Sequence, residues 1–382
     1  MKHRPISIFS CWLAIAHLLA LGCAEQGHLA KNHSHVVSDR SEYAIRYEYI
    51  GTVEGKANIV GSSSVFSTDG ELFITSGHDR VRVWHTKTLL PATDWIEHSN
   101  LVNWYLSPSG RKVLTSSADK TIHVISVPTG QIELNTPPYE DSLIDVSLNM
   151  SEDKLLAKYK SSYAIISLIN GKILFEKNEG FAIVSVTLDP SGRHFCALEQ
   201  TMGFHLLDFA TEKELLPIFP YEDLSISPPM FAKFDKKGDR LLLPKPVGYM
   251  LVEVPSGRKI SEAESNSPDC NWETRSLAVS DDGNTVGVLT GSGSVAGPAR
   301  VYDSASGSLR SVIGTHVYSG QLSSDGALLL TYDATKGSSE LWSTRTGRLL
   351  QSFEGSNASA TSDFSIIVLN NGSSTANVWK RI

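Results

Sequence analysis

The hydrophobic positions of this chain recur as short apolar runs that are broken by polar, glycine-ended turns. V-F-S-T-D-G (65–70), Y-L-S-P-S-G (105–110) and Q-L-S-S-D-G (321–326) each place an apolar residue before such a turn, and a new apolar run begins directly after the glycine. Glycine accepts the positive φ that a tight turn between two antiparallel strands requires. The pattern therefore predicts a series of β-hairpins.

Two apolar landmarks keep these hairpins in step. The first lies four residues before the glycine position, at Phe66, Leu106, Leu148, Leu188, Phe234, Val279, Leu322 and Ala360. The second follows after roughly 20 residues, at Trp84, Ile125, Ile166, Leu207, Val252, Tyr302, Trp342 and Trp379. The mean period of about 42 residues is the length of a four-stranded propeller blade. The sequence thus predicts an all-β fold, an eight-bladed β-propeller of four-stranded antiparallel blades, as a single domain over 44–382.

The two ends of the repeat region predict how the ring closes. The last repeat stops at its third strand, N-V-W-K-R-I (377–382), whereas R-Y-E-Y-I-G-T-V (46–53) precedes the first repeat and alternates as a strand does. We expect 46–53 to pair with 377–382, which leaves no open sheet edge. A helix over 151–159 is the alternative in the third repeat, but both landmarks of that repeat stay in register across it.

The first 22 residues differ in kind from the repeats. Lys2 and Arg4 precede an apolar run from Ile6 to Leu21, which is short for a membrane span and typical of a secretory signal peptide. Plain cleavage by a signal peptidase and an uncleaved anchor are the alternatives to the lipid attachment considered next.

The residues A-L-G-C at 20–23 resemble the bacterial lipobox, and this resemblance implies a diacylated Cys23 as the mature N-terminus. The chain departs from that pattern because Ala20 stands where leucine is favoured. Polar residues 23–43 predict a flexible tether. We therefore expect an exported protein in the bacterial periplasm or cell envelope, anchored by lipid.

Charge and composition restrict the classes of partner that the protein can bind. The net charge is −7, which disfavours nucleic acid, and removal of residues 1–22 takes away two basic and no acidic residues. The acidic body then contacts the membrane only through its lipid. The four cysteines form no disulfide framework or CxxC motif. No cofactor or metal is expected. No carboxylate or cysteine at typical spacing completes a metal-ligand set with His28, His33 and His35. The glycines at 291–297 are followed by a strand, whereas a phosphate-binding loop is followed by a helix.

The second repeat resembles the WD-repeat family. It contains His98, then L-S-P-S-G (106–110) and T-S-S-A-D-K-T-I-H-V-I (115–125). The resemblance implies that His98 and Asp119 belong to a buried hydrogen-bond network with a second-strand hydroxyl and a third-strand tryptophan, although Ile125 stands in the tryptophan's place. The first repeat keeps Asp79 and Trp84 but lacks the histidine. Most other repeats are degenerate, so the resemblance transfers architecture and no partner.

No catalytic constellation stands out, and we expect a monomeric scaffold, not an enzyme, that binds a protein or peptide. Eight-bladed propeller lipoproteins that assist outer-membrane protein assembly offer an analogy of architecture. The alternatives are a quinone-dependent propeller enzyme, whose repeat Y-D-S-A-S-G-S-L (302–309) matches only in part, and a hydrolytic propeller with acids converging on the channel. If blade topology follows the family, one rim gathers Arg80, Asn103, Lys120, Tyr139, Tyr221, Trp272 and Arg275. Aromatic and arginine side chains are the types that interface hot spots favour.

Overall fold

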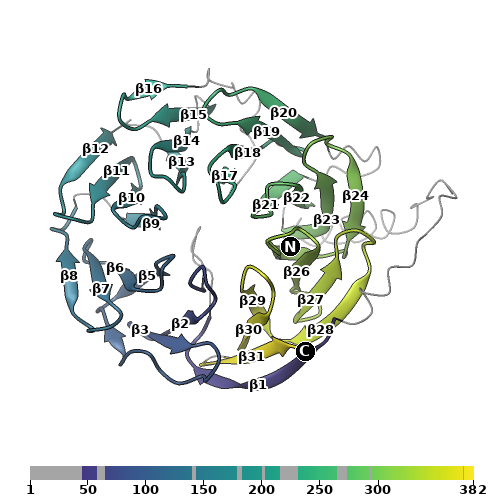
Figure 1. Cartoon of the computed structure of the whole chain (residues 1–382), viewed down its shortest axis with the longest axis horizontal. Coiled ribbons are helices and arrows are strands. Elements are labelled where there is room, and N and C mark those ends of the chain that lie inside the picture. Colours follow the sequence, from purple (N-terminus) through teal and green to yellow (C-terminus); the bar gives the residue numbers. More distant parts are fainter. Residues whose placement is uncertain are drawn as a thin grey trace, which may run out of the picture.

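Eight antiparallel sheets stand around a central axis and form a closed ring (Figure 1). The computed structural model describes residues 45–57, 65–139, 143–178, 183–199, 203–215, 231–264, 273–292, 294–372 and 374–382. The predicted eight-bladed β-propeller is confirmed. The expected signal peptide (1–22) and the tether with Cys23 (23–43) lie outside the described residues.

Blades 1 to 7 each run from an inner strand to an outer strand in chain order. Blade 1 contains β2 (Leu72–Gly77), β3 (Arg80–His85) and β4 (Ile96–Glu97), with an isolated bridge from Phe66 to Phe73 on the other side of β2. Blade 2 contains β5 (Leu101–Leu106), β6 (Lys112–Ser117), β7 (Ile122–Ser126) and β8 (Ile132–Asn135). Blade 3 contains β9 (Leu143–Leu148), β10 (Lys154–Tyr159), β11 (Ser162–Ser167) and β12 (Ile173–Asn178). The strand β10 replaces the alternative helix over 151–159.

The remaining blades follow the same order. Blade 4 contains β13 (Ile183–Leu188), β14 (His194–Glu199), β15 (Gly203–Asp208) and β16 (Lys213–Glu214). Blade 5 contains β17 (Lys233–Phe234), β18 (Arg240–Pro244), β19 (Tyr249–Glu253) and β20 (Lys259–Ala263). Blade 6 contains β21 (Glu273–Val279), β22 (Thr285–Ser292), β23 (Val295–Asp303) and β24 (Leu309–Ile313). Blade 7 contains β25 (Val317–Leu322), β26 (Leu328–Asp333), β27 (Ser338–Ser343) and β28 (Leu349–Glu354).

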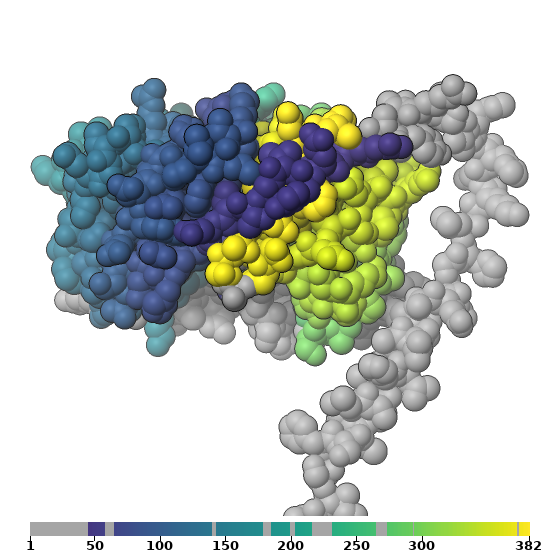
Figure 2. Space-filling view, turned by 90° about the horizontal axis from the view of Figure 1, so that it is seen from below, coloured from purple at the N-terminus to yellow at the C-terminus, as the bar shows by residue number. Residues whose placement is uncertain are grey.

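Blade 8 joins the two ends of the propeller. It contains β29 (Ser356–Ala360), β30 (Ile366–Asn371) and β31 (Thr375–Arg381), and β1 (Tyr47–Glu54) supplies the outer strand. The strand β1 pairs antiparallel with β31 from Tyr47 opposite Arg381 to Glu54 opposite Thr375, with a bulge between Tyr49 and Gly51. Figure 2 shows this strand lying along the outer surface beside the yellow C-terminal strands. The predicted closure of the ring is confirmed.

The hydrophobic core lies between neighbouring blades. In the described part of the chain, one cluster of buried side chains spans each of the eight blade junctions. In blade 3 the third strand is buried on both faces, because all six residues of β11 are buried, whereas the outer strand β12 has no fully buried residue. A blade cannot bury its two faces alone, so the ring stabilises each blade through both of its neighbours.

The turns between the first and second strands share one hydrogen-bond pattern. The residue after the apolar landmark is buried in every blade and caps its turn by accepting a hydrogen bond from the backbone N–H five residues later. These residues are Ser67, Ser107, Asn149, Asp189, Asp235, Ser280, Ser323 and Thr361. The turn glycines have the expected positive φ, for example 71° at Gly110. Glu152 and Phe364 occupy that place in blades 3 and 8, with φ of 54° and 55°.

Candidate functional site

The propeller presents two rims with different connections. On one rim, here called the connection rim, the turns between second and third strands meet the segments that link one blade to the next. The backbone N–H of His98 donates to the carbonyl oxygen of Asp79 at 3.0 Å, and that of Tyr139 donates to the carbonyl oxygen of Lys120 at 3.2 Å. On the opposite rim, the N–H of Val127 donates to the carbonyl oxygen of Arg111 at 2.7 Å and joins the other two turns of a blade.

Two of the seven rim residues expected from the sequence lie in or next to turns of the connection rim. Arg80 is exposed and follows the turn between β2 and β3. Lys120 is half-buried in the turn between β6 and β7, with φ of 71°. Tyr221 and Trp272 lie outside the described residues.

Three expected rim residues are integrated into the fold. Asn103 lies in β5, is 6% exposed, and donates through Nδ2 to the carbonyl oxygen of Ile144 in the next blade at 3.0 Å. Tyr139 stacks on the buried Tyr159, with ring centroids 3.8 Å apart. Arg275 lies in β21 and lines the central channel. Asn103 and Arg275 thus lie in inner strands, whereas Tyr139 lies in the segment between β8 and β9. The contacts of Asn103 and Tyr139 are made with a neighbouring blade.

The network expected in blade 2 is present without its tryptophan. His98 is 5% exposed, and its Nδ1 lies 2.8 Å from Thr115 Oγ1 while its Nε2 lies 3.2 Å from Thr121 Oγ1. Asp119 accepts hydrogen bonds from the N–H and the hydroxyl of Thr121 and lies 3.9 Å from His98. His123 stacks on His98 at 3.9 Å. Burial is the main cause that lowers the pKa of His98, and His123 adds to the effect.

The tryptophan that the network of blade 2 lacks is present in other blades. In blade 1, Trp84 Nε1 donates to Thr75 Oγ1 at 2.8 Å, and in blade 7 Trp342 Nε1 donates to Thr331 Oγ1 at 2.9 Å. Asp79 adopts φ of 55° and accepts a hydrogen bond from the N–H of Leu101, which begins the next blade. These residues therefore connect strands and blades.

One cluster of aromatic and cationic side chains was not predicted from the sequence. Trp95 lies just before β4, with the Cζ of Arg80 4.3 Å and the Cζ of Arg82 4.6 Å from its ring centroid. Arg82 also lies 5.5 Å from the ring of Trp84. The alternation R-V-R-V-W in β3 was the available signal, because it places Arg80, Arg82 and Trp84 on one face of the strand. This cluster is here called the Arg–Trp stack.

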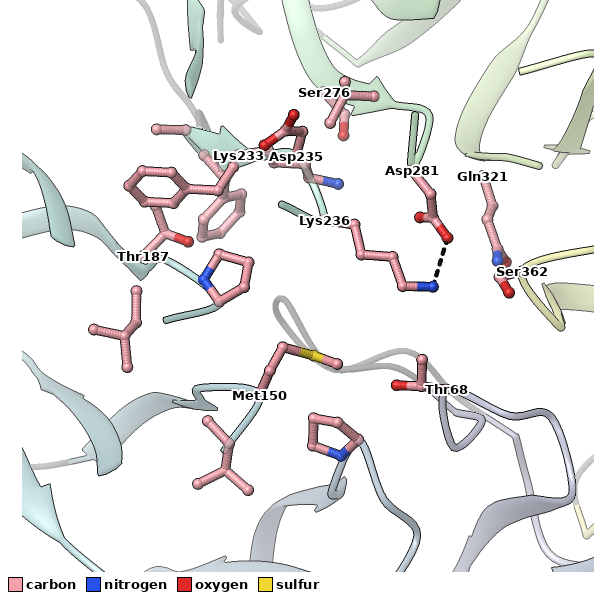
Figure 3. Close-up of a pocket in the computed structure, with 18 of the residues that line it drawn as sticks. Thr68, Met150, Thr187, Lys233, Asp235, Lys236, Ser276, Asp281, Gln321 and Ser362 are labelled. Carbon is pink, nitrogen blue, oxygen red and sulfur yellow. Dashed lines mark hydrogen bonds and ion pairs between the residues drawn. The ribbon is translucent and has the colours of Figure 1, made fainter. Parts of the chain in front are cut away.

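The central channel has a volume of about 1050 Å³ and an uneven distribution of charge. Among the residues that the structure describes, the charged lining residues belong to blades 5 and 6: Lys233, Asp235, Lys236, Glu273, Arg275 and Asp281. Figure 3 shows Lys236 reaching Asp281, with Met150 and Thr68 on another side of the opening. The ion pair between Lys236 and Asp281 measures 3.0 Å. Burial lowers the pKa of Lys233 and is the largest cause of the raised pKa of Asp235.

Other reactive groups are few in the part of the chain that the structure describes. Cys196 is a buried thiol whose pKa is raised by burial. No group of three or more histidine, cysteine, aspartate or glutamate side chains is arranged to hold a metal ion there. Among the same residues, no helix has the length and apolar character needed to cross a membrane.

Among the comparisons with known proteins, only solved structures resemble this chain. No protein-family model and no curated protein sequence matches the chain. A crystal structure of the computationally designed Ika8 protein is similar with a TM-score of 0.68 and 14% identity, over 86% of this chain and 98% of that one. The β-propeller domain of Cps50 (Swd1) from Myceliophteria thermophila is similar with a TM-score of 0.53 and 13% identity, over 74% and 99% of the two chains. At this identity the likeness shows the β-propeller fold.

Proposed function

We propose that this protein is an exported, WD-repeat-like scaffold that binds a protein or peptide at its connection rim and is anchored in a bacterial envelope by a lipid on Cys23. The propeller fold is consistent with this role. The observation that supports the choice of rim is the Arg–Trp stack, which joins the residue types that dominate interface hot spots. Its strand belongs to a closed ring, so binding would order few side chains and little backbone.

The channel gives a hydrolytic alternative less support than its three carboxylates suggest. Asp235 is buried and caps its own hairpin by accepting a hydrogen bond from the N–H of Arg240. Asp281 forms an ion pair with Lys236. Both carboxylates thus serve contacts within or between blades, and Glu273 is the third acid of the lining. We propose that the protein has no catalytic role.

Site-specific photo-crosslinking in the producing cell tests the choice of rim. A photoreactive amino acid replaces His78, whose side chain is 98% exposed in the turn between β2 and β3, or Lys87, which is 76% exposed on the opposite rim. We expect a discrete adduct with one partner from position 78, because that position adjoins the Arg–Trp stack, and none from position 87. Adducts of equal strength from both positions, or from neither, would contradict the proposed rim.

A further inference from the structure

The guanidinium groups of the Arg–Trp stack have no carboxylate partner among the residues that the structure describes. The interactions of Arg80 and Arg82 there are their contacts with the rings of Trp95 and Trp84. Arg82 Nε is buried without a hydrogen-bond acceptor. Within the described residues, two like charges around one indole therefore have no neutralising carboxylate, in a protein whose net charge is −7.

The nearest acid along the sheet does not neutralise them. Glu97 lies opposite Arg80 in the pairing of β3 with β4, so both side chains leave the sheet on the same face. The two residues nevertheless form no ion pair, and the guanidinium of Arg80 lies on Trp95 instead. Glu97 is exposed, as is Asp94 just before Trp95.

The stack holds its donors in a defined geometry. Arg80 and Arg82 are two positions apart on one strand, with Val81 between them, so their backbones lie about 7 Å apart. Val81 and Val83, which alternate with them, are fully buried against blade 2 and fix the strand. An extended peptide repeats at the same interval, and each guanidinium can take one carboxylate by two parallel N–H···O bonds.

We infer that Arg80 and Arg82, held on Trp95, bind an acidic segment of the protein partner in which two carboxylate side chains stand two residues apart on an extended chain. This inference rests on the proposed scaffold function. It specifies the chemistry of the partner, because charge complementarity at this spacing selects an acidic peptide over a neutral or basic one.

The test measures binding of a labelled peptide to the purified full-length protein by fluorescence anisotropy. The probe is Gly-Ser-Glu-Ser-Glu-Ser-Gly, and the control peptide Gly-Ser-Ser-Glu-Glu-Ser-Gly has the same composition with adjacent glutamates. We expect Arg80→Gln and Arg82→Gln each to weaken binding of the probe by about tenfold, the order expected for one charge-assisted contact. Glu97→Gln should tighten binding by about twofold, because it removes a competing carboxylate.

Arg258→Gln is the matched control. Arg258 is exposed in blade 5, pairs with Glu253 at 2.9 Å, and loses the same charge on substitution. Binding should be unchanged in this variant, and the control peptide should bind more weakly than the probe. Three results would overturn the inference. The first is that Arg258→Gln weakens binding of the probe as much as Arg80→Gln does, and the second is that the two peptides bind equally well. The third is that millimolar inorganic phosphate displaces the probe from both the Arg80→Gln variant and the wild type.

The two proposals fail in different ways. If the adduct from position 78 forms equally well in wild type and in the Arg80→Gln, Arg82→Gln double variant, the connection rim binds a partner without the acidic contact, and only the inference is wrong. If position 78 gives no specific adduct in the wild type, the proposed binding rim itself is wrong.

Discussion

At the scale of single residues, the capping side chain of each inner hairpin is the most regular feature of the fold. Serine, threonine, asparagine and aspartate all fill this buried place, for example Ser323 and Asn149. What these types share is a short side chain with an oxygen that can accept a backbone N–H. The turn position does not always hold glycine. Phe364 adopts the same positive φ there, and its side chain is fully buried between blades 7 and 8.

Replacing one cap should measure its contribution. Ser323 Oγ accepts the N–H of Leu328 at 3.0 Å and donates to Asp325 at 2.7 Å. Ser323→Ala leaves a buried N–H without this acceptor, so we expect a loss of about 1–2 kcal/mol in the free energy of unfolding. Denaturant titration followed by tryptophan fluorescence measures it. Ser324→Ala, at the half-exposed neighbour in the same turn, should have almost no effect. Equal losses from both substitutions would refute the capping role.

At the scale of elements, stability is distributed among the junctions between blades, and one junction is made by both ends of the propeller. The strand β1 contributes Tyr47 to the cluster between blades 7 and 8, and Val53 to the cluster between blades 8 and 1. The hydroxyl of Tyr47 donates to the carbonyl oxygen of Phe364, and its ring meets Phe353 edge-on at 5.7 Å. A single N-terminal strand therefore supports three blades.

Loss of that strand should loosen the ring cooperatively. Deletion of residues 44–54 exposes the edge of β31 and removes Tyr47 and Val53 from two clusters, so we expect the melting temperature to fall by many degrees. Tyr47→Ala alone should cost about 3–5 kcal/mol, as expected for loss of a buried aromatic side chain. Calorimetry provides the measurement.

The control lies in the same strand. Tyr49 is 52% exposed and contacts Trp379 from outside the ring. Tyr49→Ala should lower the melting temperature far less than Tyr47→Ala. An unchanged melting curve for the deletion would show that β1 does not hold the ring together in solution.

At the scale of the whole molecule, the eight blades lie between the two rims and surround the central channel. The charged side chains among the described lining of the channel belong to blades 5 and 6, whereas the Arg–Trp stack belongs to blade 1. A partner on the connection rim can therefore contact the stack without entering the channel. Because the whole chain is acidic, attachment to an anionic membrane surface would need a signal other than its folded surface charge.

The lipid proposed on Cys23 would be that signal. Cys23→Ser should move the protein from the membrane fraction to the soluble fraction, because a serine cannot form the thioether that holds the lipid. Fractionation of cells followed by immunoblotting measures the change, with Cys196→Ser as the control because Cys196 is a buried thiol within β14. Recovery of the wild-type protein in the soluble fraction without detergent would contradict lipidation.

The sequence by itself determined the number of blades, the positions of their hairpins and the strand that closes the ring. These features follow from local chemistry: alternation of side chains along a strand and turns that need glycine or a short polar residue. The spacing of Trp84, Ile125 and their counterparts counted the blades because each blade repeats the same local pattern. The closing strand followed because the last repeat lacked an outer strand.

Only the tertiary structure decided which polar and aromatic residues are available to a partner. Asn103 bonds to Ile144, 41 residues away, and Tyr139 stacks on Tyr159 in the next blade. Trp95 meets Arg80 and Arg82 because the outer strand of blade 1 folds back along β3. Exposure depends on what packs against a side chain from across a blade or a junction, and the periodic pattern that counts the blades does not contain those contacts.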